Sequence, residues 1–258
     1  MRNKLHSERT SARNSMSLLR VATYNIHKGR GLDRRVQIGR ITEVLRQIDG
    51  DIIALQEVLS IEGNKPEDHQ ARFIAQELGF HYRIGETRRL HGGAYGNVTL
   101  SRFPFVHTSN YDITQPGREE RGCLRTDLQI ASNRVLQVYN LHLGTSYRER
   151  AHQARKLFDS GIFKPLGERR PRIILGDFNE WISGLTSRLL KGHFNSVPVR
   201  PLFGRSRTYP GLLPLVHLDH IYFDGGMDVM KVVVHRSRKA LVASDHLPII
   251  VDFRVQSG

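Results

Sequence analysis

Several short apolar runs in this sequence stop abruptly at a carboxylate, an amide or an imidazole. The clearest is the mostly β-branched run at residues 173–175, which follows Pro171. Because proline excludes a continuing helix, we expect a strand buried on both faces. Gly176 then allows a sharp turn, and Asp177 and Asn179 follow, two residues apart and so on one face of extended backbone. Polar groups at the mouth of a buried strand are costly unless something uses them, although Asp and Asn are also common turn formers.

The same arrangement recurs along the chain. The polar residues at the edges of apolar runs are Asn25, Glu57, His142, Asp177 with Asn179, Asp219, and Asp245 with His246. Each position has a plain alternative: strand-end Asn and Glu are often exposed, a His between leucines can be a core residue, and Ser-Asp-His can form a surface turn. If the plain alternative held independently at each position, all of these residues would rarely occur together in one chain.

If these strand ends meet at one rim, they bring together four carboxylates, two amides and two imidazoles. The sequence has no nucleophile elbow, no Walker-type loop and no His-Glu-x-x-His motif. Oxygen ligands with few carboxylates suit Mg²⁺ or Mn²⁺, and Mg²⁺ also binds substrate phosphate. Histidines beside a phosphate can donate to its oxygens. The pattern therefore predicts metal-assisted attack of water on a phosphoester.

The chain is strongly basic. Lysine and arginine number 39 against 25 acidic residues, which gives a formal charge of +14 and a pI near 10.4. Such a balance attracts nucleic acid, anionic lipid surfaces or phosphorylated substrates, with a general bias towards arginine as the plain alternative. The arginine-rich segments 169–172 and 236–239 could seat the chain on anionic lipid, which leaves peripheral membrane contact open.

Cysteine usage and hydropathy indicate the compartment. A single cysteine, Cys123, excludes an internal disulfide and a cysteine-based zinc cluster. No apolar stretch approaches the ~20 residues of a membrane span. The basic N-terminus lacks the apolar segment of a secretory signal. We therefore expect a cytoplasmic protein without a transmembrane segment, and a monomer.

Composition divides the chain into a tail and one domain. Residues 1–17 are basic and polar and are expected to be disordered, whereas residues 18–258 show no repeat or linker. Apolar patterning predicts strands at 18–26, 51–58, 81–84, 95–101, 105–113, 122–131, 134–141, 218–223, 229–235 and 247–255, besides the run at 173–175. It predicts helices at 35–48, 66–78, 148–161 and 183–190, and a flexible basic loop at 27–31. Short links between strands favour antiparallel pairing, so we expect two sheets packed face to face with helices outside.

These pieces together resemble the endonuclease/exonuclease/phosphatase superfamily. The matching segments are 23–26, 55–58, 96–102, 140–142, 176–179, 218–221 and 244–246. Gly-Asp-Phe-Asn at 176–179 and Ser-Asp-His at 244–246 are the most specific, and the resemblance extends from residue 18 to about residue 255. The segments 25–29 and 176–181 look most like an uncharacterised bacterial branch.

The resemblance implies an α/β fold, namely a four-layer α/β/β/α sandwich with two mainly antiparallel sheets. It also implies a divalent-metal phosphohydrolase that uses Mg²⁺ or Mn²⁺. By family role, Glu57 holds the metal, with Asn25 beside it and Asp245 next to the metal.

The resemblance also assigns the remaining site residues. Asp177 orients or deprotonates the attacking water, and Asn179 helps to place the phosphate. His246 contacts the phosphate and is buttressed by Asp219. His142 marks the deoxyribonuclease, sphingomyelinase and inositol-phosphatase-like members, whereas abasic-site endonucleases carry tyrosine there. Two further positions match substrate-side residues of the family, Asn97 and Arg121.

Three functions stay open at this point. The first is a phosphodiesterase or endonuclease acting on nucleic acid, which the positive charge favours, although no aromatic stacking platform is recognisable. The second is a phosphoesterase for phospholipid or another small phosphorylated molecule, like a sphingomyelinase or an inositol phosphatase. The third, a non-enzymatic binding protein, is disfavoured because no expected catalytic position is substituted.

Overall fold

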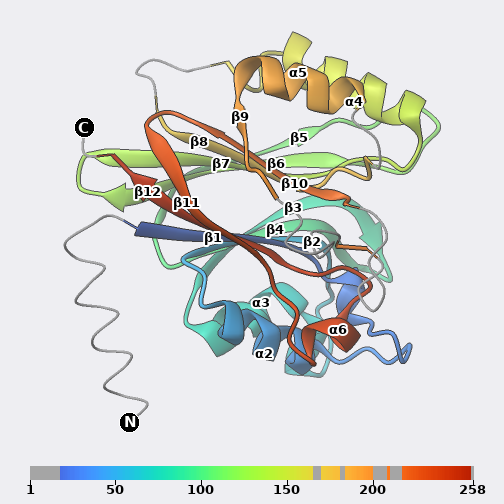
Figure 1. Ribbon diagram of the computed structural model, residues 1–258. Coiled ribbons are helices and arrows are strands. Elements are labelled where there is room, and N and C mark those ends of the chain that lie inside the picture. Colours follow the sequence, from blue (N-terminus) through green and yellow to red (C-terminus); the bar gives the residue numbers. More distant parts are fainter. Residues whose placement is uncertain (1–17, 165–169, 181–183, 200–207, 210–216, 257–258) are drawn as a thin grey trace.

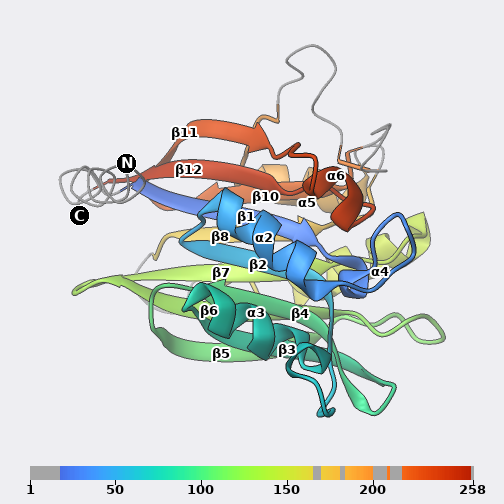
Figure 2. The same cartoon turned by 90° about the horizontal axis from the view of Figure 1, so that it is seen from below.

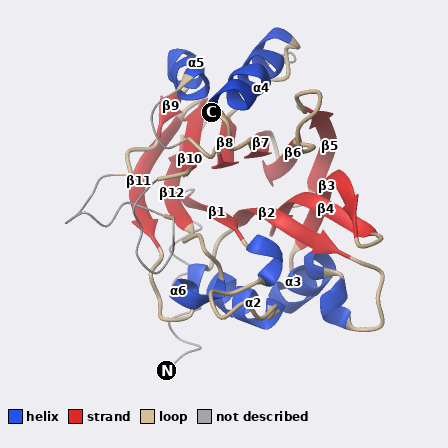
Figure 3. Cartoon of the chain, turned by 90° about the vertical axis from the view of Figure 1, so that its right-hand side faces the viewer, coloured by secondary structure: helices blue, strands red, loops and turns tan. Residues whose placement is uncertain are grey.

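The computed structural model describes residues 18–164, 170–180, 184–199, 208–209 and 217–256. Two six-stranded sheets lie face to face, and helices cover the outer side of each (Figure 1). Viewed from the side, the helix, sheet, sheet and helix layers are distinct (Figure 3). The predicted four-layer sandwich is thereby confirmed, whereas the predicted tail at 1–17 lies outside the described residues.

The first sheet contains the chain's first and last strands. Its order is β11 (Met227–Val234), β12 (Ile249–Val255), β1 (Leu18–Asn25), β2 (Ile52–Ser60), β4 (Gly93–Ser101) and β3 (His81–Leu90). Only β1 and β2 run parallel within it. Strand β3 extends well beyond the predicted 81–84. The prediction was too short because the second half of the strand is a polar edge segment without the apolar alternation that marks a strand.

The second sheet has the same layout. Its order is β5 (Phe105–Asp112), β6 (Gly122–Ala131), β7 (Arg134–His142), β8 (Arg172–Asp177), β10 (Asp219–Asp224) and β9 (Asn195–Ser196). Here β7 and β8 form the one parallel pair. The expectation of mainly antiparallel sheets is confirmed.

Two sets of helices cover the sheets. Helices α2 (Ile38–Ile48), α3 (Gln70–Leu78) and the short α6 (Ala240–Ala243) lie over the first sheet, where α2 and α3 cross its central strands (Figure 2). Helices α4 (Tyr147–Asp159) and α5 (Leu185–His193) lie over the second. The helix predicted at 66–78 is divided by His69 into a 3-10 turn, η2 (Pro66–Asp68), and α3. No helix in the described part of the chain has the length and apolarity needed to cross a membrane.

The apolar side chains form three layers of core. Alternation along β1 sends Ala22 and Tyr24 towards the helices and Val21 towards the other sheet. Residues 173–175 do the same in β8, since Ile173 and Leu175 lie between the sheets and Ile174 faces α4 and α5. Burial on both faces, as predicted for this run, is therefore confirmed.

Arg172, at the start of β8, is not available to a lipid surface. Its guanidinium is 8% exposed and pairs with Asp224 of β10, and it also donates to the backbone oxygen of Phe163. The proposed lipid-contacting segment 169–172 is wrong at this position because the charge is neutralised inside the fold. Arg169 lies outside the described residues.

The two parallel pairs bring the polar strand ends together. In β7 and β8, His142 lies opposite Asp177, and in β10 Asp219 lies opposite the same Asp177. Gly176 is essential to this arrangement: its φ is +142°, and a Cβ there would lie 1.9 Å from the backbone oxygen of Leu141. Only glycine allows β7 and β8 to approach so closely at the point where the polar residues begin.

Candidate active site

Asp177 lies at the centre of a buried polar cluster. Its side chain is 1% exposed, and its Oδ2 accepts a hydrogen bond from Asn25 Nδ2 at 3.0 Å. The same oxygen lies 3.5 Å from His246 Nε2 and 3.7 Å from His142 Nε2. Four predicted residues from β1, β7, β8 and the segment before β12 thus meet at one carboxylate oxygen.

Asn179 joins this cluster by a turn. It has a left-handed φ of 48°, so the expectation of extended backbone from Asp177 to Asn179 is wrong. Its backbone N–H donates to Asp177 Oδ1 at 2.9 Å, and its side-chain amide donates to the Leu143 carbonyl at 2.9 Å. Phe178, between them, is buried against Tyr222 and anchors the turn. Asp177 is therefore held both by the turn at 177–179 and by Asn25 of the first sheet.

Glu57 occupies the first-sheet side of the cluster. Its Oε1 accepts from Asn25 Nδ2 at 3.1 Å and its Oε2 from Lys28 Nζ at 2.8 Å. It lies at an irregularity in the β2–β4 pairing and has a φ of 57°, which turns it out of the strand's regular alternation. Burial alone would raise the pKa of Glu57, but the charge that His142 gains in acid, the Lys28 ammonium and the hydrogen bonds from Lys28 and Asn25 outweigh burial and hold that pKa well below its usual range. The carboxylate is therefore anionic.

His246 and Asp219 form a buried pair. The Nδ1 of His246 lies 3.0 Å from Asp219 Oδ2. Burial would lower the pKa of His246, but the charges of Asp219 and Asp177 outweigh burial and raise that pKa, so the ring is an imidazolium between two carboxylates. His142 behaves oppositely: burial, with the nearby Arg121 guanidinium, lowers its pKa to about 3 and keeps it neutral. The two imidazoles thus differ in charge.

Asp245 lies at the edge of the cluster. Its Oδ1 is 3.3 Å from Ser244 Oγ and 3.5 Å from His27 Nδ1. Ser244 Oγ in turn donates to the Asn25 carbonyl at 2.8 Å, which ties the segment before β12 to the end of β1. Asp245 is thus held beside Asn25, on the side of the cluster that faces solvent.

The two predicted substrate-side residues are placed differently. The amide nitrogen of Asn97 donates to the carbonyls of Gly122 and Asn140, at 3.1 and 3.2 Å, and so links the two sheets. Arg121 is buried near His142, whose pKa it lowers, and pairs with Glu119 at 2.8 Å. The donors of Asn97 are therefore already used within the fold, whereas Arg121 borders the cluster.

Two further residues adjoin the site and were not predicted. Lys28 lies in the segment 27–31. This segment was predicted as a flexible loop, but it contains a 3-10 turn, η1 (His27–Gly29). Gln70 fixes the turn by donating to the Lys28 carbonyl at 2.7 Å. Tyr209 lies with its ring centroid 5.0 Å from that of His246. The basic composition of 27–31 was the only sequence signal for Lys28, and Tyr209 had none.

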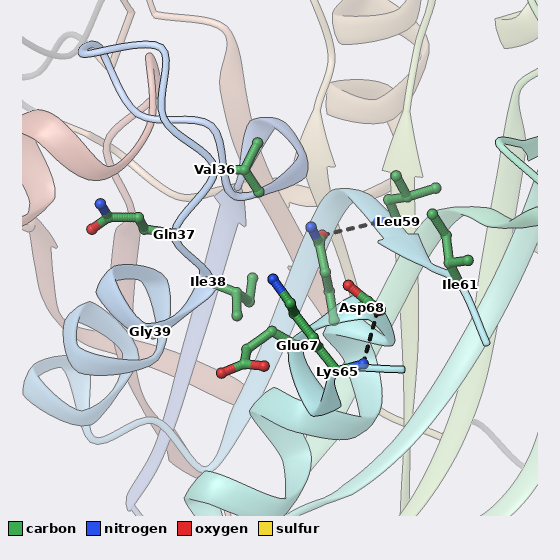
Figure 4. A pocket seen from close by; sticks show the side chains of 10 residues that line it. Val36, Gln37, Ile38, Gly39, Leu59, Ile61, Lys65, Glu67 and Asp68 are labelled. Atoms are coloured by element: carbon green, nitrogen blue, oxygen red, sulfur yellow. Dashed lines mark hydrogen bonds between the residues drawn. The ribbon is translucent and has the colours of Figure 1, made fainter. Parts of the chain in front are cut away.

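A separate hollow of about 560 Å³ lies behind η1, beside η2 and the start of α2 (Figure 4). Gln70 lines it and accepts from the Leu59 N–H at 3.1 Å. None of its lining residues belongs to the cluster around Asp177. Through Gln70, which donates to the Lys28 carbonyl, the wall of this hollow holds η1 in place. The hollow itself is not part of the candidate active site.

Two groups of side chains in the described part of the chain could hold a cation. Asp177, Asp219 and His246 have ligand atoms within 4.8 Å of one another. However, an imidazolium has no lone pair to offer, and its positive charge already offsets one of the two carboxylate charges. Glu57 offers carboxylate oxygens towards Asn25 and Asp177, and its present counter-charge is the Lys28 ammonium. Such hard oxygen donors suit Mg²⁺ or Mn²⁺.

Comparison with known proteins agrees with this arrangement. Residues 22–246 match the Endonuclease/Exonuclease/phosphatase family, and the chain therefore belongs to that family. It is 28% identical over 247 residues to the uncharacterised protein YbhP of Escherichia coli, covering 92% of this chain and 96% of the relative.

Solved structures show the same fold. An endonuclease/exonuclease/phosphatase from Beutenbergia cavernae matches with a TM-score of 0.72 at 22% identity, covering 93% of this chain and 72% of the other. A mannosyl-6-phosphatase from Bacteroides thetaiotaomicron matches with a TM-score of 0.71 at 19% identity, covering 91% and 99%. At these identities the likeness establishes the architecture, and the chemistry must be argued from the site.

Proposed function

We propose that this protein is a divalent-metal-dependent phosphoester hydrolase. The observation that carries the proposal is the meeting of Asn25, His142 and His246 at one oxygen of the buried Asp177 carboxylate. Acidic, amide and imidazole groups converging from both sheets are suited to one phosphoryl group and one attacking water. Family membership supports the same reaction class.

In this proposal Glu57 holds the metal, with Asn25 and Asp245 beside it. Bound Mg²⁺ or Mn²⁺ would supply charge neutralisation at the phosphoryl oxygens. The amide nitrogen of Asn25 now faces Glu57 and Asp177, while its oxygen accepts from the His27 N–H at 3.0 Å. Turning this amide would present the oxygen to a cation, so Asn25 fits either state.

Asp177 is the proposed base. Burial raises the pKa of its carboxyl above the usual range, while the positive charge of His246 opposes the rise. Its Oδ1 accepts from the Asn179 N–H within the turn, whereas Oδ2 accepts from Asn25 and lies near both imidazoles, so we assign Oδ2 as the oxygen that accepts a proton from water. The Asn25 amide keeps that oxygen aimed into the cluster.

The imidazoles and the Asn179 amide contact the phosphate in this proposal. His246, held positive by Asp219, can donate from Nε2 to a phosphoryl oxygen. His142 is neutral and can donate one hydrogen bond without adding charge. Asp219 acts through His246 as a positioning residue, because it is buried behind the ring.

Two substrate classes follow from the charge of the chain. A phosphodiesterase or endonuclease acting on nucleic acid in the cytoplasm is the first, since a charge of +14 attracts a polyanion. A phosphoesterase for phospholipid or another small molecule is the second, and it is favoured by the buried Arg121 beside His142, which suits a compact anionic substrate.

A parallel assay tests the reaction and separates the classes. The full-length protein with Mg²⁺ would be given plasmid DNA, RNA, a phospholipid panel and bis(4-nitrophenyl) phosphate. We expect hydrolysis of the aryl ester, and its loss in Asp177→Asn. Nucleic-acid cleavage that persists through repurification and disappears in the same variant would support the first class. Wild-type activity in Asp177→Asn would refute the proposed base.

A further inference from the structure

A pair of arginines beside the cluster shares one carboxylate. Arg88, in the polar half of β3, lies with its Nη2 2.7 Å from Glu119 Oε1, and Arg121 Nη2 lies 2.8 Å from Glu119 Oε2. The Arg121 side chain is only 7% exposed. Glu119 is partly exposed on the turn before β6. One acidic side chain thus occupies the space between two cations.

The arginine donors are not all satisfied by this carboxylate. The Nε atoms of Arg88 and Arg121 are buried and have no hydrogen-bond partner among the described residues. A guanidinium carries five N–H donors in a fixed fork, and an unsatisfied buried donor costs free energy. A group with more acceptor oxygens than a carboxylate would satisfy the pair better.

The pair is continuous with the catalytic cluster. The Arg88 guanidinium lies over the Tyr95 ring, 4.9 Å from its centroid, and Lys28 Nζ lies 5.7 Å from the same centroid. Lys28 Nζ in turn contacts Glu57, and the nearby charge of Arg121 lowers the pKa of His142. The two arginines are therefore linked to the cluster around Asp177 through the contacts of Tyr95, Lys28 and His142.

The backbone at Arg121 is held by hydrogen bonds at the end of the second sheet, whereas Glu119 lies outside its strands. The Arg121 N–H donates to Thr114 Oγ1 at 3.0 Å, and its carbonyl accepts from the Ile113 N–H at 3.0 Å. Glu119 lies two residues earlier, on the turn that contains Pro116 and Gly117. The cation is fixed at the end of the sheet and its counter-charge lies on the turn.

We propose that Arg88 and Arg121 form a subsite for a second phosphate of the substrate, a terminal phosphomonoester, and that Glu119 occupies this subsite until the substrate displaces it. The subsite rests on the proposed function, because it names the substrate class of that site. Two guanidinium charges against one carboxylate leave one positive charge. A phosphomonoester with nearly two negative charges neutralises both arginines, whereas a phosphodiester only replaces Glu119 with an equal charge.

Binding to the metal-free, full-length protein tests the subsite separately from hydrolysis. Isothermal titration in EDTA would compare thymidine 3′,5′-bisphosphate, thymidine 5′-monophosphate and a 5′-phosphorylated thymidine dinucleotide, in which the second phosphate is a diester. We expect the bisphosphate to bind about tenfold more tightly than the other two, equivalent to ~1.4 kcal/mol.

Variants then identify the residues. Glu119→Gln removes the competing carboxylate and should tighten binding of the bisphosphate about tenfold, and also that of the monophosphate, since either ligand can place a phosphomonoester between the arginines. Arg88→Gln should abolish the preference, and Arg88→Lys, which keeps the charge but loses the fork, should restore only part of it. Glu120→Gln, the same change at the next, exposed residue, is the matched control and should have no effect. Melting temperatures would verify that each variant is folded.

Three results would overturn the subsite: equal affinity for all three ligands, no detectable binding of any of them, or no gain in bisphosphate affinity in Glu119→Gln. A tighter dinucleotide than bisphosphate would instead assign the arginines to a diester and refute the terminal phosphate. Because turnover is not needed, these outcomes stand apart from hydrolysis of bis(4-nitrophenyl) phosphate, whose absence would count against the proposed reaction alone.

Discussion

Asp177 shows how much of the site depends on one side chain. Its two oxygens accept from Asn25 and from the Asn179 backbone, and both imidazoles lie near Oδ2. Replacing it changes the proton acceptor and the anchor of the turn together. His246 is different because Asp219 holds it from behind.

We therefore expect Asp177→Ala and His246→Ala each to lower phosphoester hydrolysis by at least ~10²-fold, since each removes a proton-transfer or charge-stabilising group. The measurement is the rate with an aryl phosphodiester and Mg²⁺, together with circular dichroism to verify the fold. Asp228→Asn, on β11, is the control and should retain full activity. Near-normal activity in either alanine variant would remove the proposed mechanism.

Gly176 gives a stability prediction. Gly176→Ala places a Cβ 1.9 Å from the Leu141 carbonyl oxygen at a φ of +142°. We expect the free energy of unfolding to fall by at least ~3 kcal/mol, through clash and backbone strain together. Gly192→Ala in α5 is the matched control: nothing lies within 4 Å of its added Cβ, and a helical alanine should stabilise by ~0.5–1 kcal/mol. Urea denaturation measures both, and equal effects would contradict the prediction.

At the residue scale, the sequence revealed the anionic members of the site better than the cationic ones. Asp177 and Glu57 follow apolar runs and Asp219 precedes one, and a buried carboxylate is conspicuous there. Lys28 and Arg88 occur among many basic residues; the position of Lys28 depends on Gln70, which is distant in sequence, and that of Arg88 on Tyr95, its partner on the neighbouring strand. The role of Asn97 in linking the sheets could not be read from its own segment.

At the scale of elements, strands β8 and β10 are joined by a buried charge pair. Arg172 pairs with Asp224, the residue opposite it in the strand register, and its guanidinium lies over the Phe194 ring. Truncating only one partner of such a pair leaves the other as an uncompensated buried charge.

Arg172→Met should therefore lower the free energy of unfolding by ~3–5 kcal/mol. The double variant Arg172→Met/Asp224→Leu should recover much of this loss, because both charges are then absent. Arg46→Met is the control, since its pair with Glu77 is exposed and should contribute under ~1 kcal/mol. Denaturation midpoints measure all three, and a double variant as unstable as the single one would argue against the pair.

Helix α3 begins at a histidine cap. The His69 Nδ1 accepts from the Arg72 N–H at 3.2 Å, which requires an unprotonated ring. Burial, with the nearby Arg72 charge, lowers the pKa of His69, and Glu62 opposes the shift. Because the folded pKa is below the unfolded value of ~6.5, the cap stabilises fully above that pH and is lost as the pH falls through the folded pKa.

His69→Ala should thus cost ~1 kcal/mol near pH 8 and progressively less in acid. Urea denaturation across pH measures the difference, with His81→Ala, at an exposed position, as the control. A cost that stays constant with pH would show that the ring acts by packing and not by capping.

Elements were predictable where one face is apolar. Helix α2 was located closely because its buried residues recur at three- and four-residue spacing, and strands β6 and β7 because the polar turn at 132–133 separates two largely buried runs. The division of the predicted 66–78 helix at His69 could not be predicted. It depends on the hydrogen bond from the Ala71 N–H to Ser60 Oγ and on the Ser60–His69 bridge to β2. The polar half of β3 had no apolar period at all.

For the whole molecule, the proposed metal should stabilise the fold. Adding Mg²⁺ to the chelated protein should raise its melting temperature, by the equivalent of ~2.7 kcal/mol at a hundredfold excess over the dissociation constant. Glu57→Gln should abolish most of this shift. If Asp219→Asn abolished it and Glu57→Gln did not, the metal would belong to the Asp177–Asp219–His246 group instead. Calorimetry measures both without any substrate.

The overall architecture was the most predictable level, because the alternating strands and flanking helices define layers irrespective of detail. The order of strands was not predictable from periodicity alone. Each sheet places its only parallel pair at the centre, and this follows from crossover connections through α2 and α4. Family resemblance, more than residue patterning, led to the proposed reaction.

The position of β12 has a consequence for synthesis of the protein. This last strand lies inside the first sheet, between β11 and β1, and the segment leading into it carries His246. A chain still emerging from the ribosome lacks both the strand and the imidazole, and its β1 has no antiparallel neighbour. The candidate site therefore cannot assemble until this segment has been synthesised and has paired with β1.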